Sequence, residues 1–485
     1  TIDLTKGTLD TNGQTCNWGF FDSGGSSART LTLGASQISV NFSSNNCWNT
    51  NNSGLTLNAG TSTITLNGSS ETFRTSSYTF YSIVIAGSGS HYFNNSASAF
   101  TCTNFTITGT ANKTDNFQLG SNITVTGALT INGNSSINRE LVSSNTVGTA
   151  RTFTTTGATV TCTNTDFQDI TLSVAKDFSA QTDIGDCGGN SGITFPASVS
   201  QAWSGTSGGN WSTNAWTTRV PLPQDDVTIS SAFSASQTVT ADMPRLGRSI
   251  DWTGATGSPT WANSAASDIF GSLTLISGMS VTASSSFTYR GRGNYTITSA
   301  GNTFANVCAI NCPTGTYTLN DALSSTSASG FFLNGGGFNS NGFSVTFKLF
   351  VLNNSSTRSL TMGSSNWIAT DTGATTPWNL STSTGMTLSS TSSTITYSTS
   401  STSTRTFAGG GLTYGTLTYT VAGSTGELDI TGSNSFAQIN FSDVTNARSL
   451  KFTAGTTTTI RNTNGFNVQG TSGKLMTVAS ITAAT

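Results

Sequence analysis

Ala28-Arg-Thr-Leu-Thr-Leu-Gly34 is the stretch that decides the fold of this chain, because the chain contains it twice. Thr357-Arg-Ser-Leu-Thr-Met-Gly363 repeats it more than three hundred residues later. The match extends further along both copies, where Trp48-Asn49 of the first corresponds to Trp378-Asn379 of the second. Only single-residue slips separate the two copies over about forty positions. Similarity of this length indicates duplication rather than shared composition. An internal repeat predicts a fold made of repeating structural units.

Short triplets of the form apolar-Thr-apolar recur within and beyond the repeat, for example Leu31-Thr-Leu33 and Ile64-Thr-Leu66. In an extended strand the two outer residues of such a triplet point to one face and the Thr points to the other. Gly, Asn and Ser, which favour turns, separate the triplets. No stretch of ten or more residues shows helical periodicity. The pattern predicts an all-β chain.

The spacing of the triplets separates two all-β architectures. Leu273-Thr-Leu275, Tyr295-Thr-Ile297 and Tyr317-Thr-Leu319 recur every 22 residues, close to one coil of a parallel β-helix, in which each coil contributes two or three short strands. An array of immunoglobulin-like sandwiches, the alternative, would show turn signals every ~8–12 residues. The spacing therefore favours a parallel β-helix, or β-solenoid. Stacked coils also explain the abundance of Thr, Asn and Ser, which can form hydrogen-bonded ladders between neighbours.

The composition excludes several classes of protein. Charged residues make up 8% of the chain, against roughly 25% in typical domains, and like charges stacked ~5 Å apart in a solenoid would repel. The 28 Phe and nine Trp argue against disorder. A net charge of −2 gives no basic face for nucleic acid. No apolar run approaches the roughly 18 residues of a membrane span. We therefore expect neither nucleic acid nor membrane as a partner.

Composition also divides the chain into three regions. Residues 1–192 form the first expected solenoid segment, and residues 267–485 form the second, which carries the second copy of the repeat. Residues 193–266 between them are rich in Trp and Pro. We therefore expect two related solenoid segments that flank a Trp-rich insert.

The cysteines and the single histidine suggest no metal or cofactor site. Cys162 with Cys187 is the first expected disulfide and Cys308 with Cys312 the second, whereas the other three of the seven Cys are expected to be buried thiols. None has zinc-like spacing. His91 follows Gly and Ser residues and has no nucleophile motif beside it. We expect it in a solvent-facing loop.

Catalysis on polysaccharides generally needs two carboxylates that face each other across a groove. The candidate pairs are Asp166 with Asp169, Asp183 with Asp186, and Asp225 with Asp226. Adjacent residues of a strand point to opposite faces, so the last pair could not share a substrate from a regular strand. The Asp-x-x-Asp pairs are more often turn formers. We therefore expect the chain not to be an enzyme.

The most specific local signature is Ala202-Trp-Ser-Gly-Thr-Ser-Gly-Gly-Asn-Trp211-Ser-Thr-Asn-Ala-Trp216 with the following Val220-Pro-Leu-Pro-Gln-Asp-Asp-Val-Thr-Ile229. It resembles a segment at the start of β-solenoid units in secreted passenger proteins and in phage-encoded structural proteins. Large Thr/Gly-rich proteins of tailed bacteriophages contain short sequence segments that are similar to residues 239–254, 185–194 and 407–414. The resemblance implies a fibre-like or spike-like β-helical protein of a virion, a class usually without an assigned activity.

The tryptophans of that signature have two interpretations. Trp203, Trp211 and Trp216 could form a platform on which carbohydrate rings stack, since aromatic faces suit sugars. Alternatively, they form a compact cap or inserted core whose side chains bury apolar area. The second interpretation is favoured.

The leading functional hypothesis is a non-enzymatic, virion-associated structural or adhesive protein: a tail fibre, spike or surface decoration. The open sheet edges at the ends of a solenoid predict self-association as a homo-oligomer or filament. Other virion proteins and cell-surface carbohydrate are further candidate partners, on a virion or an extracellular surface. One alternative is a secreted bacterial or archaeal surface filament or adhesin subunit, mildly supported by the absence of Met before Thr1. The less favoured alternative is a polysaccharide depolymerase.

Overall fold

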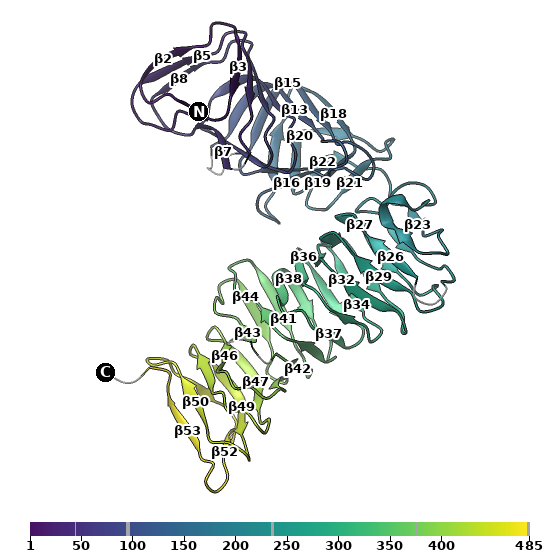
Figure 1. Ribbon diagram of the computed structural model, residues 1–485, viewed down its shortest axis with the longest axis vertical. Coiled ribbons are helices and arrows are strands. Elements are labelled where there is room, and N and C mark those ends of the chain that lie inside the picture. Colours follow the sequence, from purple (N-terminus) through teal and green to yellow (C-terminus); the bar gives the residue numbers. More distant parts are fainter. Residues whose placement is uncertain (44, 94–97, 234–236, 372, 374–375, 483–485) are drawn as a thin grey trace. The chain divides into compact units, whose positions relative to one another are not determined.

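A computed structural model describes residues 1–43, 45–93, 98–233, 237–371, 373 and 376–482 (Figure 1). The chain divides into two compact units. The first contains residues 1–199 with the segment Leu222–Gln224, and the second contains residues 200–221 and 225–485. The described residues are all-β with parallel strands stacked as a β-solenoid of about 20 coils. The predicted fold class is therefore confirmed.

In the described part of the first unit, each coil adds strands to parallel sheets. One sheet consists, in order, of β1 (Ile2–Asp3), β4 (Phe21–Asp22), β7 (Asn45–Thr50), β10 (Glu71–Thr75), β12 (Ser90–Phe93), β14 (Asn116–Leu119), β16 (Glu140–Ser144), β19 (Thr165–Gln168) and β21 (Ile184–Asp186). A second consists of β3 (Thr15–Trp18), β6 (Gln37–Val40), β9 (Thr63–Leu66), β11 (Thr79–Ile85), β13 (Phe100–Thr108), β15 (Ile123–Asn132), β17 (Arg151–Thr154), β20 (Ile170–Asp177) and β22 (Ser191–Thr194), with β18 (Thr159–Thr163) paired to β15. A short third sheet consists of β2 (Gly7–Asp10), β5 (Arg29–Thr32) and β8 (Leu55–Asn58).

The second unit has one long sheet that follows most of its described coils. It consists of β23 (Ser200–Ala202), β25 (Asp226–Thr228), β27 (Arg245–Gly247), β28 (Ile250–Asp251), β30 (Ser267–Ile269), β31 (Leu273–Thr274), β33 (Phe287–Tyr289), β34 (Asn294–Thr298), β36 (Cys308–Leu319), β38 (Phe331–Asn339), β40 (Phe350–Val351), β41 (Arg358–Thr361), β43 (Trp378–Asn379), β44 (Met386–Ser389), β46 (Arg405–Ala408), β48 (Leu428–Thr431), β50 (Arg448–Phe452) and β53 (Met476–Ser480).

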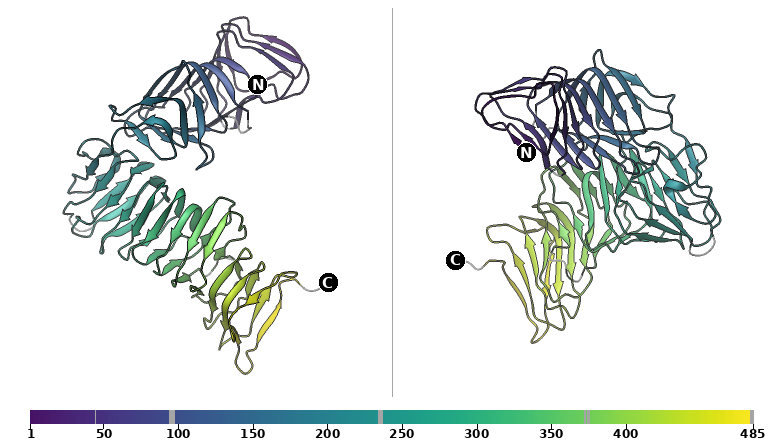
Figure 2. Two further views of the ribbon diagram at one scale, coloured as in Figure 1. Left: turned by 180° about the vertical axis from the view of Figure 1, so that it is seen from behind. Right: turned by 45° about the horizontal axis from the view of Figure 1, so that its top comes forward.

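Two further sheets complete the described coils of the second unit. The first consists of β24 (Gly209–Asn210), β26 (Thr238–Ala241), β29 (Thr260–Asn263) and β32 (Ser280–Ala283). The other consists of β35 (Thr303–Phe304), β37 (Leu323–Ser325), β39 (Val345–Phe347), β42 (Asn366–Ala369), β45 (Thr394–Tyr397), β47 (Thr413–Tyr419), β49 (Ser435–Ser442) and β51 (Thr459–Ile460), with β52 (Phe466–Gln469) paired to β49. The 3₁₀ turn η1 (Trp211–Thr213) precedes β25. Figure 2 shows the same stacking of strands within each unit from other sides.

The two sequence repeats adopt the same local structure. Arg29 of β5 pairs with Leu55 of β8, and Arg358 of β41 pairs with Met386 of β44 in the same register. The repeated Trp side chains are fully buried inside their coils. Trp48 stacks on Phe73 with ring centroids 5.8 Å apart, and Trp378 stacks on Phe407 at 6.0 Å. The repeated residues therefore serve packing rather than ligand contact, as the sequence indicated.

The outward side chains form the predicted polar ladders between neighbouring coils. Thr163 donates to the Asn132 amide oxygen at 2.9 Å, and Asn320 donates to the Thr298 hydroxyl at 3.1 Å. The inward positions of the same strands are apolar; Ile131, for example, is fully buried beside Asn132. Alternation between core and ladder thus continues from coil to coil.

The structure divides the chain at a different place from the three regions suggested by composition. Residues 200–221 and the described part of 225–266 form the first coils of the second unit, because β23 pairs with β25 and β26 pairs with β29 in parallel. Trp252 and Trp261 occupy buried positions in these coils. The abrupt change in composition is therefore a change of core side chains, while the solenoid geometry continues.

Gly54 and Gly385 occupy the same turn of the two repeats, with φ of 86° and 70°. A Cβ on Gly385 would lie 2.6 Å from the Ser356 carbonyl oxygen on the neighbouring coil. Left-handed strain and this clash should lower the free energy of unfolding by about 2–3 kcal/mol in Gly385→Ala. Gly423→Ala is the matched control, because its φ is 83° and no heavy atom lies within 4 Å of the new Cβ.

Urea unfolding of both variants measures the difference. Strain alone should cost Gly423→Ala about 1–2 kcal/mol, so Gly385→Ala should lose more. Equal losses would show that the close approach of neighbouring coils at this turn does not limit the residue type.

Candidate functional site

The structure brings the three predicted site tryptophans together at the first coil of the second unit. The ring centroids of Trp203 and Trp211 lie 6.0 Å apart, those of Trp203 and Trp216 lie 5.5 Å apart, and those of Trp211 and Trp216 lie 5.0 Å apart. Trp203 follows β23, Trp211 begins η1, and Trp216 lies in the next loop. We call these three residues the Trp cluster.

The Trp cluster packs as a cap on the core. Trp203 is 3% exposed and Trp211 is fully buried, whereas Trp216 is half-buried. The Trp216 indole donates to the Trp211 carbonyl at 3.0 Å, and the Trp203 indole donates to the Gly205 carbonyl at 2.8 Å. A sugar platform needs exposed ring faces, which Trp203 and Trp211 lack. The geometry therefore favours the cap interpretation over the carbohydrate platform.

Trp216→Ala tests the cap interpretation, because Trp216 is the one member of the cluster that is partly exposed. We expect the free energy of unfolding to fall by about 1–2 kcal/mol from lost apolar burial. Glycan-array binding should not change. A loss of glycan binding at wild-type stability would instead support the platform interpretation.

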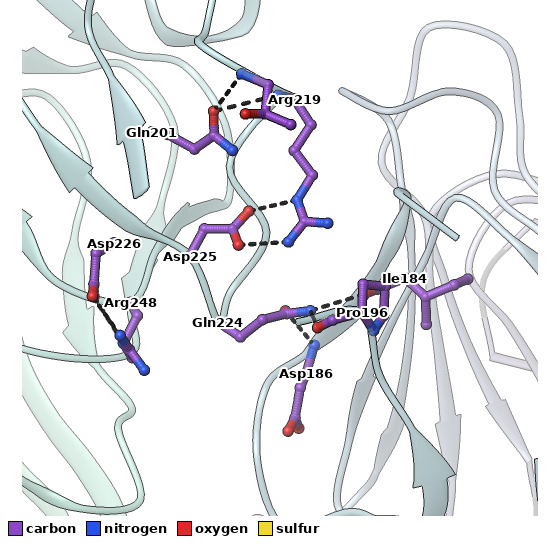
Figure 3. Close-up of polar contacts among 10 residues, drawn as sticks. Ile184, Asp186, Pro196, Gln201, Arg219, Gln224, Asp225, Asp226 and Arg248 are labelled. Atoms are coloured by element: carbon purple, nitrogen blue, oxygen red, sulfur yellow. Dashed lines mark hydrogen bonds and ion pairs between the residues drawn. The ribbon is translucent and has the colours of Figure 1, made fainter. Parts of the chain in front are cut away.

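The adjacent carboxylates Asp225 and Asp226 point to different partners (Figure 3). Asp225 is fully buried and accepts hydrogen bonds from Arg219 Nη2 at 2.6 Å and Nε at 2.8 Å. Asp226, in β25, accepts from Arg248 Nε at 2.7 Å on a side that is 39% exposed. The hydrogen bond from Arg248 lowers the pKa of Asp226. The two side chains therefore lie on opposite faces, as the extended chain predicted.

Two glutamines hold the backbone around these acids (Figure 3). The buried amide oxygen of Gln201 accepts from the backbone N–H groups of Thr218, at 3.1 Å, and Arg219, at 3.3 Å. Within the first unit, Gln224 donates to the Ile184 carbonyl at 3.1 Å and accepts from the Asp186 N–H at 2.9 Å. Both amides satisfy backbone groups of loops, which is a structural role.

The remaining candidate acids are also bound to structural partners. Asp166 and Arg139 form a buried ion pair with an N–O distance of 2.8 Å. The other three accept backbone hydrogen bonds: Asp169 from Gly148 at 2.9 Å, Asp183 from Asn164 at 2.7 Å, and Asp186 from Gly188 at 2.8 Å. Hydrogen bonds of this kind fix turns and coil contacts. Each of the six candidate carboxylates therefore contacts a group that belongs to the framework of the fold.

His91 does not lie in a solvent-facing loop, so that expectation was wrong. It occupies an inward position of β12 and is 1% exposed, with Nε2 2.9 Å from the Gly87 carbonyl oxygen. Burial lowers the pKa of His91, while the contact with Gly87 and the charge of Asp115 raise it in part. The flanking Gly and Ser residues suggested a loop, but Ser90-His-Tyr-Phe93 alternates between outward and inward positions as a strand.

The expected disulfide between Cys162 and Cys187 is not formed, because Cys162 is a free thiol. Cys162 lies in β18, whereas Cys187 directly follows β21 of a different sheet. Cys308 and Cys312 are also free thiols, so the second expected pair does not form. Burial raises the pKa of Cys162 to about 12 and that of Cys312 to about 11. The thiols therefore stay protonated and react slowly.

A shallow groove of about 400 Å³ on the second unit was not found from the sequence. Its lining residues come from neighbouring coils and are almost all neutral and polar: Thr418, Thr420, Asn440, Phe441, Ser442, Asn467 and Gln469. Asn467 donates to the Asn440 amide oxygen at 3.0 Å, and Asn440 donates to the Thr418 hydroxyl at 3.3 Å. We call this surface the polar groove. Apart from Phe441, which is a core residue, only the outward position of the lining residues in their strands could have indicated the groove.

The described ranges contain no group of three or more His, Cys, Asp or Glu side chains that could hold a metal ion. In the same ranges no helix is long and apolar enough to cross a membrane. Comparison with protein-family models, curated proteins and solved structures finds no match to this chain. What the chain does must therefore be inferred from its own geometry.

Proposed function

We propose that this chain is a non-enzymatic structural and adhesive component of a virion: a fibre, spike or surface decoration. The observation that carries the proposal is the parallel ladder of each unit, whose strands extend from coil to coil over a closed apolar core. Such ladders satisfy the backbone hydrogen bonds of every internal strand. A protein built in this way is suited to a structural role on a particle surface, where it bears mechanical force, rather than to catalysis.

The side-chain chemistry supports the same proposal. The six candidate acids have structural partners, and the buried thiols at Cys162, Cys308 and Cys312 do not form cross-links. Core packing, backbone ladders and buried side-chain contacts such as the Arg139–Asp166 ion pair stabilise the coils. A surface protein with these features keeps its fold without an oxidant or a metal ion.

The polar groove supports the adhesive part of the proposal. Amide and hydroxyl groups such as those of Asn440, Asn467 and Gln469 can donate and accept hydrogen bonds, and the lining residues carry no formal charge. Neutral carbohydrate presents a matching set of hydroxyl groups. Cell-surface carbohydrate is therefore the partner that we propose for this surface.

Immunogold electron microscopy with antibodies against residues 1–485 tests the location. We expect label at a fixed position on purified virus particles. Label confined to the envelope of the producing cell would contradict the virion proposal and favour a secreted surface filament.

Incubation of the protein with host capsule and wall polysaccharides tests the absence of catalysis. We expect binding without release of oligosaccharides, measured by chromatography of the soluble fraction. Reproducible release would overturn the non-enzymatic assignment and favour a depolymerase.

A further inference from the structure

An Asn-Gly pair can react with itself, because glycine has no side chain to shield the backbone nitrogen that attacks the asparagine side chain. The sequence contains six such pairs, which begin at Asn12, Asn67, Asn132, Asn334, Asn341 and Asn464. The pairs share one chemistry but lie in different surroundings. The fold therefore decides which of them are able to react.

Asn341 and Gly342 form the exposed tip of the turn between β38 and β39. Their φ values are 52° and 81°, and the Phe343 N–H closes the turn by donating to the Ser340 carbonyl at 2.8 Å. Left-handed conformations at both central residues are typical of a primed turn, in which Asn-Gly is favoured. In the described part of the chain the Gly342 N–H has no hydrogen-bond partner. Its nitrogen is therefore available to the neighbouring side chain.

This turn lies inside the stack of the second unit. β38 pairs with β36 on one side and with β41 on the other, and β39 pairs with β37 and β42. Coils of the same unit thus flank the turn on both sides. The Asn341 amide donates to the Leu319 carbonyl of the preceding coil at 3.3 Å. Asn12-Gly13 occupies the same turn of the first repeat, with φ values of 51° and 69°.

Asn464-Gly465 is the closest match that differs at the attacking nitrogen. Asn464 is also exposed and left-handed, with a φ of 60°. Its glycine N–H, however, donates to the Asn462 carbonyl at 3.0 Å. This hydrogen bond has to break before the nitrogen can attack, which adds to the barrier.

The other pairs are held by the coils around them. The Gly133 N–H after Asn132 donates to the Thr163 carbonyl at 3.0 Å. The Asn67 amide donates to a serine hydroxyl of the preceding coil at 2.7 Å. Asn334 lies within β38 rather than in a turn. These contacts restrict the rotation that brings the side chain to the backbone nitrogen.

We propose that Asn341-Gly342 is a site of spontaneous deamidation. The Gly342 nitrogen attacks Cγ of Asn341 and gives up its proton to solvent, and the side-chain nitrogen leaves as ammonia. The product is a five-membered succinimide ring. Water then opens the ring at either carbonyl and gives aspartate or isoaspartate. One water is consumed for each ammonia released, and nothing is oxidised or reduced.

The product changes a contact between coils. A carboxylate cannot donate to the Leu319 carbonyl, so the bond from position 341 is lost and two acceptors face each other. Isoaspartate also adds a methylene to the main chain of the turn. The inference goes beyond the proposed function and does not depend on it.

Peptide mapping by mass spectrometry tests the proposal on the full chain during incubation in mildly alkaline buffer. We expect the acid product at Asn341 to form at least about fivefold faster than at Asn464 and Asn132, the factor that one net hydrogen bond contributes to a rate. Urea-unfolded protein is the control, since the rates of the pairs should converge once the fold is lost. Equal rates at Asn341 and Asn464 in the folded chain, or no product at Asn341, would overturn the proposal.

Gly342→Ala tests which atom attacks. A Cβ on Gly342 would meet only the Ser364 hydroxyl, at 3.9 Å, so it fits at the cost of left-handed strain. The methyl group shields the nitrogen, and the product at Asn341 should form severalfold more slowly, while the rate at Asn464 stays the same. An unchanged rate at Asn341 would contradict attack by the Gly342 nitrogen. If this variant folds poorly, the comparison of Asn341 with Asn464 in the wild-type chain still decides the proposal.

Discussion

Arg358→Ala should lower the free energy of unfolding of the second unit by about 3–5 kcal/mol. Arg358 is 1% exposed, and its Nη1 donates to the carbonyls of Ser356 at 2.8 Å and Thr384 at 2.9 Å. Its Nη2 donates to the carbonyls of Thr382, at 2.6 Å, and Leu352. These carbonyls belong to turns of adjacent coils, so one guanidinium holds them together. Alanine would leave buried acceptors unpaired and a cavity beside them.

The duplication provides an internal replicate of this experiment. Arg29 is 3% exposed and donates through Nη1 to the carbonyls of Ser27, at 2.7 Å, and Ser53, at 3.0 Å. Arg29→Ala should therefore destabilise the first unit by a similar amount. Urea unfolding with Trp fluorescence measures both variants, and Lys6→Ala at an exposed position is the control. A loss below about 1 kcal/mol at both arginines would show that water can replace the guanidinium.

Glu71→Gln should stabilise the first unit by roughly 3 kcal/mol above about pH 8, and by little at about pH 4. Glu71 begins β10 and its side chain is fully buried. Burial raises its pKa from 4.5 to about 8, although backbone hydrogen bonds at Gly68 and Phe42 offset part of the effect. The carboxyl group is therefore neutral in the folded state at neutral pH.

The sign of the pH dependence follows from proton counts. Between about pH 4.5 and pH 8 the folded chain keeps the Glu71 proton and the unfolded chain has lost it, so the free energy of unfolding falls as pH rises. The folded state therefore has its full stability with respect to Glu71 below about pH 4.5, and it has lost this contribution above about pH 8. The pKa of His91 is lowered by burial, so its contribution is instead lost as pH falls.

The difference between wild type and Glu71→Gln isolates the glutamate from His91. Urea unfolding at about pH 5, 7 and 9 should give a difference that grows with pH. A constant difference across this range would show that Glu71 titrates normally in the folded chain.

The internal repeat, the alternation of apolar residues with Thr and the 22-residue spacing of the triplets were together sufficient to predict the β-solenoid. The alternation is local: Leu31 and Leu33 face the core because of their spacing within one strand. The packing roles of Trp48 and Trp378 followed from the same logic. The opposite directions of Asp225 and Asp226 followed from strand geometry alone.

The remaining features depend on contacts between distant residues, which spacing does not reveal. Cys162 and Cys187 suit a disulfide in sequence, but their strands belong to different sheets. His91 lies between turn-forming residues, yet the neighbouring coils bury it. The polar groove depends on which outward residues of β47, β49 and β52 lie side by side. The Trp cluster was predicted as residues, but only packing distinguished a cap from a platform.

The coil-to-coil register has a consequence for how such a gene can change in length. Recombination that adds or removes one complete coil leaves every inward residue of the flanking coils inward, because each coil contacts mainly its neighbours. An insertion of one residue within a strand reverses the faces of all residues up to the next turn. Length variation among natural descendants should therefore come in whole coils or in turn loops. The duplicated segments around Arg29 and Arg358 are a record of that kind of growth.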